Sequence, residues 1–202
     1  MHAVEGGDYR ELSVADLVAA VKKLAGPPQA QGGLRQGIEY VCWTGGEPLL
    51  QWRSMADAIF KLSGNFCHTI ETDGEVDFRP FNDAVRGHRD AGQVRYIVDV
   101  KCPGSGMTAK KVFDNLAFLE HFDEVKFVLL DGQDYEFAKE TLAKYPALGG
   151  KTVLFSPVTA AHKVQRGLDP ATLAQWILDD KLSVRLQLQI HKVVWPGKER
   201  GI

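Results

Sequence analysis

The feature that most constrains the fold is a regular alternation of strand-like and helix-like segments along the 202 residues. Six short segments rich in β-branched and aromatic residues are predicted to be strands, beginning about every 30 residues. They span residues 38–44, 66–72, 94–101, 124–130, 152–156 and 184–190. Helices are predicted at residues 13–24, 49–62, 80–87, 109–121, 134–145 and 170–179. This order predicts an α/β domain with a parallel sheet and right-handed crossovers.

Two architectures fit this order, an open doubly wound sheet and a barrel or partial barrel. Polar side chains at the carboxyl ends of the predicted strands favour the barrel, because that end carries the functional site of such folds. These residues are Thr44, Glu71, Asp99, Lys101, Ser156 and His191. Residues 26–37 are polar and rich in glycine, so we expect a loop rather than a linker between domains. Residues 1–202 are therefore predicted to form a single domain.

The composition argues against several classes of protein. A net charge of −2, from 24 basic and 26 acidic residues, does not favour nucleic-acid binding. No stretch of about 18 apolar residues predicts a membrane span, and the N-terminus shows no signal-peptide pattern. Three widely separated cysteines, Cys42, Cys67 and Cys102, predict no disulfide framework and a reducing cytoplasmic location.

The most specific local motif is Thr-Gly-Gly-Glu-Pro-Leu at residues 44–49, directly after a predicted strand and before a predicted helix. Two glycines allow positive φ angles and a close approach of the backbone to a ligand. Glu47 supplies a carboxylate that can accept hydrogen bonds from an ammonium group, and Pro48 suits the first helical turn. The alternative is a tight turn in which Glu47 only complements the helix dipole.

Residues 44–49 resemble the GGEP motif of radical S-adenosylmethionine (SAM) enzymes, which holds the amino group of the methionine moiety. Further segments resemble, in order, strand ends and the C-terminal tail of the 7-carboxy-7-deazaguanine synthase family. These segments are residues 70–74, 98–103, 123–128, 155–157, 185–192, 195–196 and 200–202. Since the resemblance runs over almost the whole chain, it indicates that family rather than the superfamily alone.

The resemblance implies conversion of 6-carboxy-5,6,7,8-tetrahydropterin to 7-carboxy-7-deazaguanine with loss of ammonia. It implies SAM, a [4Fe–4S] cluster and Mg²⁺ as cofactors, with a 5′-deoxyadenosyl radical that abstracts hydrogen from the substrate. A homodimer, a reductant such as flavodoxin or ferredoxin, and a partial (β/α) barrel of the radical SAM type are further expectations.

The resemblance also assigns site residues. SAM is expected to contact Gly45, Gly46, Glu47, Asp99, Val100, Lys101, Ser156, Pro157, Val158 and Thr159. The pterin is expected to contact Thr44, Glu71, Thr72, His191 and Lys192. Asp73 departs from the family pattern, which has Asn there, and Lys126 lies in an otherwise apolar strand without an assigned role.

The cysteines do not match the family. An iron–sulfur cluster requires thiolates, and the superfamily supplies them from C-x₃-C-x₂-C after its first strand. The chain contains no such motif, and its three cysteines are expected to be small, buried, inert side chains. Helix 13–24 resembles a crossover helix, yet no predicted strand precedes it. We therefore expect the first strand and the cluster loop to lie upstream of residue 1.

Three functional hypotheses follow from these observations. The leading one is a synthase-like enzyme whose 202 residues do not assemble the cluster or turn over by themselves. The second is a catalytically silent homologue that binds SAM or pterin and acts as a partner or regulator. The third, a barrel aldolase or isomerase, is weakened by the absence of a placed Schiff-base lysine or acid–base pair beyond Lys101 and Lys126.

Overall fold

The computed structural model describes residues 11–26, 29–31, 34–36, 38–62, 64, 66–107, 110–158, 167–190 and 194–195. Six strands form one parallel sheet in which each strand pairs with the next along the chain. They are β3 (Tyr40–Trp43), β4 (Cys67–Thr72), β5 (Val94–Val100), β6 (Glu124–Leu129), β7 (Thr152–Pro157) and β8 (Arg185–Leu186). Because the strand order never reverses in this sheet, it lacks the switch point of a doubly wound fold. The prediction of an α/β partial barrel is confirmed.

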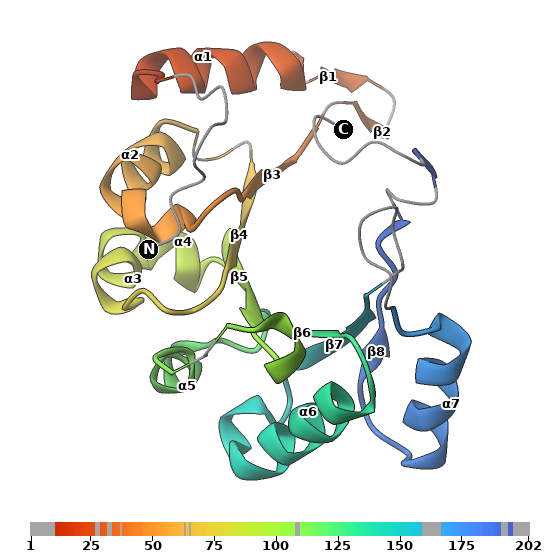
Figure 1. Ribbon diagram of the computed structural model, residues 1–202. Coiled ribbons are helices and arrows are strands. Elements are labelled where there is room, and N and C mark those ends of the chain that lie inside the picture. Colours follow the sequence, from red (N-terminus) through yellow and green to blue (C-terminus); the bar gives the residue numbers. More distant parts are fainter. Residues whose placement is uncertain are drawn as a thin grey trace.

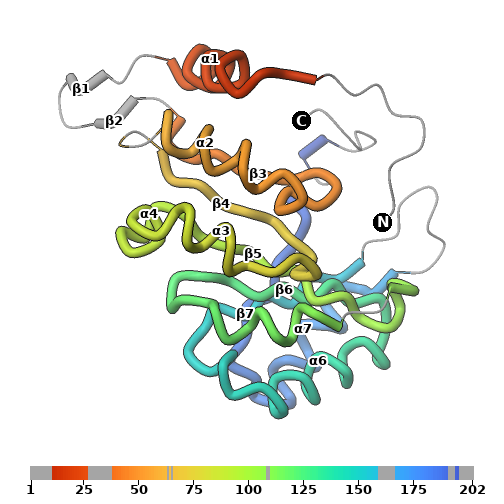
Figure 2. Tube along the Cα trace, turned by 90° about the vertical axis from the view of Figure 1, so that its left-hand side faces the viewer, coloured from red at the N-terminus to blue at the C-terminus, as the bar shows by residue number. Residues whose placement is uncertain are grey.

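Helices cover the outer side of this curved sheet, and α1 lies on top of α2 at one end of the molecule (Figures 1 and 2). The α-helices are α1 (Val14–Ala25), α2 (Trp52–Leu62), α3 (Arg79–Ala84), α4 (Arg86–Asp90), α5 (Val112–Asn115), α6 (Gly132–Lys144) and α7 (Pro170–Asp179). Short 3₁₀ turns are η1 (Pro48–Gln51), η2 (Pro103–Ser105), η3 (Leu116–Phe118) and η4 (Pro146–Leu148). Within the described residues, every helix is too short or too polar to cross a membrane.

The prediction that residues 26–37 form only a loop is wrong. Two short strands, β1 (Gln29–Gln31) and β2 (Leu34–Gln36), pair there in antiparallel register. The sequence signal was the Gly-Gly dipeptide at residues 32–33, which is typical of two-residue hairpin connections.

Two other predicted elements are shorter in the structure. The helix expected at 109–121 is limited to α5 and the turn η3, and the strand expected at 184–190 is limited to β8. The Asn115 amide, at the end of α5, donates to the carbonyls of Gly74 and Val76 at 2.7 and 2.8 Å. Among the described strands, β8 lies at the edge of the sheet, and its two residues pair with β7.

The two faces of the sheet differ in character. On β5, Val94, Val98 and Val100 are buried in the main hydrophobic core, whereas the intervening residues are only half-buried. β4 and β6 show the same period of two. One face of the strands therefore packs on the helices, and the opposite, inner face carries polar side chains such as Asp99 and Lys126.

A buried ion pair fixes the beginning of β5 and β6. The Arg89 guanidinium donates to both carboxylate oxygens of Asp123 at 2.7 Å, and the two side chains are 6% and 0% exposed. Asp123 also accepts the backbone N–H groups of Tyr96 and Glu120 at 2.7 Å. The Asp123 carboxylate thus has enough partners to offset much of its desolvation.

Candidate active site

The turn after β3 leaves backbone open to a ligand. Gly45 and Gly46 have φ angles of +94° and +58°, which side chains other than glycine rarely adopt. Apart from the adjoining residues, no atom of the described part of the chain lies within 4 Å of the position that a Cβ would take at either residue. The strain-free turn therefore depends on glycine, and the described residues leave space beside it for the expected contact with SAM.

The carboxylate of Glu47 is held between this turn and the end of β4. It caps η1 by accepting the Leu49 N–H at 2.9 Å. The Thr72 hydroxyl lies 2.9 Å from both of its oxygens, and the Asp73 N–H donates to Oε2 at 3.0 Å. Thr72 is 3% exposed, so the structure places it behind Glu47 as a support for the carboxylate.

The pKa of Glu47 is raised to about 7. Desolvation is the largest cause and the side chain of Asp73 adds to it, while the N–H groups of Leu49 and Asp73 and the Thr72 hydroxyl oppose the shift. The Asp73 side chain accepts the Glu75 N–H at 3.0 Å. The departure from the family's Asn at this position therefore puts a second carboxyl group beside Glu47. An ammonium group bound here would meet two acidic side chains.

Glu71 and Thr44, both expected to contact the pterin, lie together on the inner face of the sheet. The Thr44 hydroxyl donates to Glu71 Oε2 at 3.4 Å. The Cys42 thiol also hydrogen-bonds Glu71, and desolvation together with the negative charge of Glu71 raises its pKa to about 11. Cys42 is therefore a neutral thiol on the floor of this site.

Buried polar atoms without partners identify the next part of the site. Lys101 donates to Asp99 Oδ2 at 2.6 Å, but Asp99 Oδ1 is buried and has no partner among the described residues. Ser156 is fully buried, and its hydroxyl likewise has no partner within the described part of the chain. Since buried polar groups are almost always satisfied, both atoms fit a site for a polar ligand such as SAM.

The other predicted contacts are less direct. Val100 is fully buried in the core, and Pro157 ends β7. The Val158 N–H donates to the Leu129 carbonyl at 2.8 Å, and its carbonyl accepts the Leu168 N–H at 2.9 Å, so both backbone groups of Val158 are used within the fold. Thr159, His191 and Lys192 lie outside the described residues.

The cysteines do not fit a cluster. Cys42 is exposed, Cys67 is half-buried and Cys102 is buried. The expectation that all three are buried is wrong for Cys42, because its side chain lies on the open inner face of the edge strand β3. No three His, Cys, Asp or Glu side chains in the described part of the chain lie close enough together to hold a metal ion. These residues therefore do not provide the ligands of an iron–sulfur cluster or of Mg²⁺.

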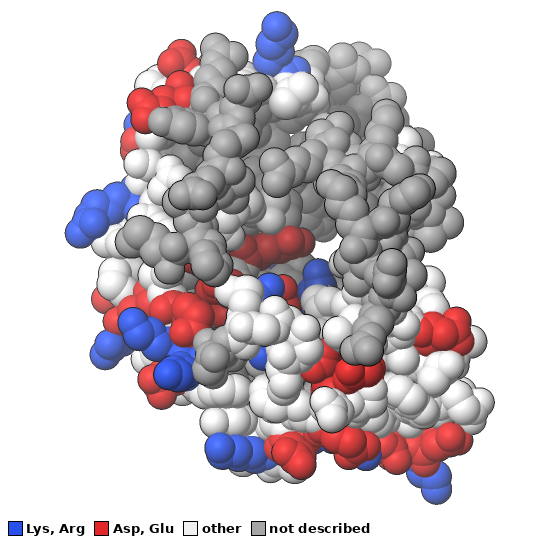
Figure 3. Space-filling model, in the orientation of Figure 1, with Lys and Arg blue, Asp and Glu red and all other residues white. Residues whose placement is uncertain are grey.

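Two further residues, which the motifs did not assign to the site, lie on the inner face of the sheet. Lys126 is level with Asp99 in the sheet, and Gln187 lies beside Ser156 with a buried, unpaired side-chain oxygen. Figure 3 shows acidic and basic side chains inside a hollow at the centre of one face of the molecule. The alternation of side chains along the strands was the available signal for both residues.

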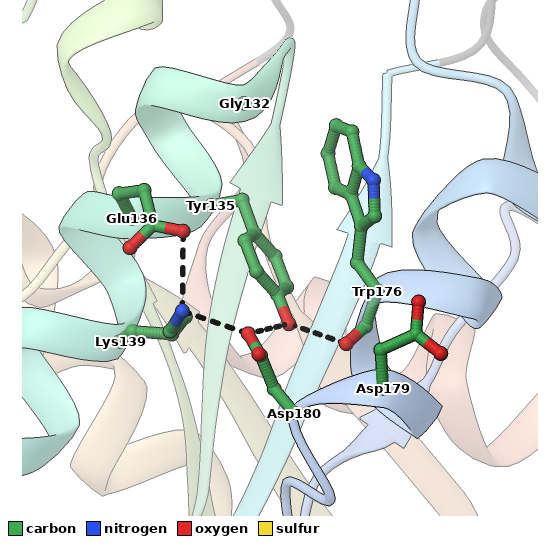
Figure 4. A pocket seen from close by; sticks show the side chains of 7 residues that line it. All are labelled: Gly132, Tyr135, Glu136, Lys139, Trp176, Asp179 and Asp180. Carbon is green, nitrogen blue, oxygen red and sulfur yellow. Dashed lines mark hydrogen bonds and ion pairs between the residues drawn. The ribbon is translucent and has the colours of Figure 1, made fainter.

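A second pocket lies between α6 and α7, has a volume of about 460 Å³ and contains none of the predicted site residues (Figure 4). Its polar groups satisfy one another. Lys139 bridges Glu136 and Asp180 at 3.1 and 2.7 Å, and the Tyr135 hydroxyl lies 2.8 Å from Asp180 Oδ2. Because these charges are already paired, the strand ends are the stronger candidate site.

Comparison with known proteins gives a consistent result. The chain is 39% identical to the 7-carboxy-7-deazaguanine synthase of Koribacter versatilis over 212 aligned positions, which cover all of the chain and 83% of that relative. Proteins of the same name from Chlorobaculum tepidum and Methanospirillum hungatei are each 34% identical to it. Those two alignments cover 79% and 81% of the chain, and 67% and 62% of the relatives.

No family model and no solved structure matches the chain. The assignment depends on the sequence relatives, and the α/β fold with its parallel sheet agrees with them. The chain therefore belongs to the 7-carboxy-7-deazaguanine synthase family of radical SAM enzymes.

Proposed function

We propose that the cleft at the strand ends binds SAM and 6-carboxy-5,6,7,8-tetrahydropterin, and that the chain serves the conversion of this pterin to 7-carboxy-7-deazaguanine with loss of ammonia. Family membership supports the reaction. The single observation that carries the assignment of the site is the Glu47 carboxylate, held by three donors beside an open glycine turn. Such a carboxylate is suited to an ammonium group.

Within this proposal, Glu47 and the Gly45–Gly46 turn bind the methionine end of SAM. Asp99 and Ser156 offer the unpaired buried atoms that would contact the remaining polar groups of SAM. Bound SAM supplies the adenosyl group for radical chemistry, and the protein supplies placement and exclusion of water. Nothing in the structure or the comparisons favours a catalytically silent homologue.

Glu71 is proposed to recognise the pterin ring by hydrogen bonding. The aminopyrimidinone edge of a pterin presents two parallel N–H donors, which match the two oxygens of a carboxylate. Glu71 lies on the inner face with Thr44, which supplies a hydroxyl group to the same region. Thr44 and Glu71 would thus fix the orientation of the ring.

The [4Fe–4S] cluster and Mg²⁺ stay part of the proposal for the family's reaction, but no described residue group fits them. A homodimer, a flavodoxin or ferredoxin reductant and a cytoplasmic location complete the proposal.

Binding of 6-carboxypterin, a fluorescent analogue of the substrate, tests the proposed function. The wild-type chain should bind it, and Glu71→Gln should weaken binding about ten-fold or more, because one of the two matched acceptors becomes a donor. Glu140→Gln, on the exposed side of α6, removes the same charge away from the site and should have no effect. Absence of binding by the wild type would contradict the proposal.

A further inference from the structure

The inner face of β6 carries one lysine, Lys126, to which no motif assigned a role. Lys126 is in register with Asp99 on β5 and with Leu154 on β7, so the three side chains share one face of the sheet. Its side chain is half-buried. Within the part of the chain that the structure describes, its ammonium group forms no hydrogen bond and no ion pair. A partly desolvated ammonium without a counter-charge is costly, which favours an anionic ligand.

The acidic side chains on the same face of the sheet have other partners. Asp99 is paired with Lys101 at 2.6 Å, and Glu71 contacts Thr44 and Cys42. The charge of Lys126 nevertheless acts on the Cys42 thiol in opposition to that of Glu71, so both charges face the same region.

Two further charged groups lie deeper on the same face. Glu124 is in register with Ile97, two residues before Asp99, and Arg95 lies another two residues before Ile97. Within the described part of the chain, no ion pair joins Glu124 with Lys126 or with Arg95, and the Arg95 Nε is itself buried and unpaired. Lys126 is the cation that lies at the level of Asp99, nearer the carboxyl ends of the strands.

A second observation supports a ligand on this part of the inner face. Ser156 is in register with Val128, the next residue of β6 on the inner face after Lys126, and its fully buried hydroxyl has no partner. The Gln187 N–H donates to the Phe155 carbonyl at 2.9 Å, which places Gln187 beside Ser156. Its buried side-chain oxygen is also unpaired. These two unpaired groups mark this part of the inner face as ligand-facing. SAM would satisfy Ser156, as proposed above, and the pterin would lie beside SAM on the side of Lys126.

We propose that Lys126 determines specificity by binding the carboxylate of the pterin substrate, an inference that rests on the proposed function. One strand separates β4 from β6, and Glu71 is level with Glu124, two residues before Lys126, so the backbones of Glu71 and Lys126 lie about 12 Å apart. A bicyclic ring with recognised groups at both ends spans such a distance. Glu71 then contacts the aminopyrimidinone edge, and Lys126 contacts the carboxylate at the opposite end.

Fluorescence titration with two probes, 6-carboxypterin and unsubstituted pterin, tests this proposal. A chelator is included so that no divalent ion supplies the positive charge. The wild-type chain should prefer 6-carboxypterin, and Lys126→Gln should lower that affinity about ten- to a hundred-fold while leaving pterin binding unchanged. Lys126→Arg should retain most of the preference. Lys23→Gln, on the exposed side of α1, serves as the matched control and should retain all of it.

Each of the other possible outcomes would contradict the inference. If Lys126→Gln still prefers 6-carboxypterin, the inference is wrong while the proposed function stands. If both probes lose affinity equally, Lys126 has a structural role and the inference is wrong. If the variant loses affinity for SAM, titrated separately, but not for 6-carboxypterin, the carboxylate belongs to SAM and the inference is again wrong. If the wild type binds neither pterin, the proposed function fails together with the inference.

Discussion

The Asp73 N–H donates to the Glu47 carboxylate at 3.0 Å, and the side chains of these two residues form a pair of acidic groups at the end of β4. Because the donor is the backbone N–H, this hydrogen bond to Glu47 does not depend on which side chain residue 73 carries. The Asp73 carboxyl group adds to the raised pKa of Glu47. Acidic groups that share a site in this way couple ligand binding to pH.

Glu47→Gln should change how stability depends on pH. Desolvation raises the pKa of Glu47 from 4.5 in the unfolded chain to about 7, so the folded state retains a proton between these values. Wild-type stability is therefore lost as the pH rises through this window, and Asp73 and Tyr96 are the ionisable groups whose charges couple to it. Chemical denaturation at about pH 5 and about pH 8 measures the unfolding free energy of both proteins. The value for Glu47→Gln minus that for wild type should be larger at about pH 8 than at about pH 5. A constant difference would contradict the raised pKa.

His68 should make the fold sensitive to acid. Burial, and to a smaller extent the charge of His88, lowers its pKa from 6.5 to about 4, and the Trp43 indole N–H donates to its Nδ1 at 3.1 Å. Since the unfolded state takes up the proton first, stability is lost as the pH falls from 6.5 towards 4. Relative to wild type, His68→Gln should flatten this loss in denaturation curves, whereas His121→Gln on the surface should not. Parallel curves for wild type and His68→Gln would refute the prediction.

Asp123→Asn should destabilise the protein by about 3–5 kcal/mol, because it leaves the buried Arg89 guanidinium without its counter-charge. The matched control is Asp83→Asn, which breaks an exposed pair with Arg86 and should cost at most about 1 kcal/mol. Urea denaturation measures both values. Equal losses would show that the Arg89–Asp123 pair does not anchor β5 and β6.

Gly74→Ala should cost more than its backbone conformation alone requires. Gly74 has a φ of +73°, and an added Cβ would lie 2.5 Å from Val112 Cγ2 and 3.1 Å from Val98 Cγ1. Gly150 has a φ of +81° with no atom near its Cβ position, so Gly150→Ala measures the conformational cost alone. Thermal denaturation should show Gly74→Ala to be less stable than Gly150→Ala by about 1–3 kcal/mol. Similar losses would mean that α5 moves away without cost.

Anaerobic reconstitution of the 202-residue chain with iron and sulfide should yield no [4Fe–4S] cluster. The three cysteines differ in exposure, and none belongs to a described group of three potential metal ligands. Iron analysis and visible absorbance check this prediction. Stoichiometric incorporation of about four irons per chain, with the absorbance of a cluster, would overturn it.

The order of strands and helices was predictable from the sequence, because each strand carries its own apolar pattern and pairs with the next along the chain. Thr44 and Glu71 were also predictable, since parallel strands bring their carboxyl ends together. The positioning role of Thr72 was not, because its hydroxyl contacts Glu47 across 25 residues of sequence. Lys126 emerged only from the sheet register, which a single sequence does not specify.

The central claim is that SAM and the pterin bind at the carboxyl ends of the parallel strands. Hydrogen–deuterium exchange, with and without 6-carboxypterin and SAM, locates the site directly through the backbone N–H groups. We expect the ligands to protect the backbone N–H groups from exchange in peptides covering residues 44–47, 71–74 and 156–158. Protection confined to α6 and α7, around the pocket of Trp176 and Asp180, would contradict it, and so would an absence of any protection.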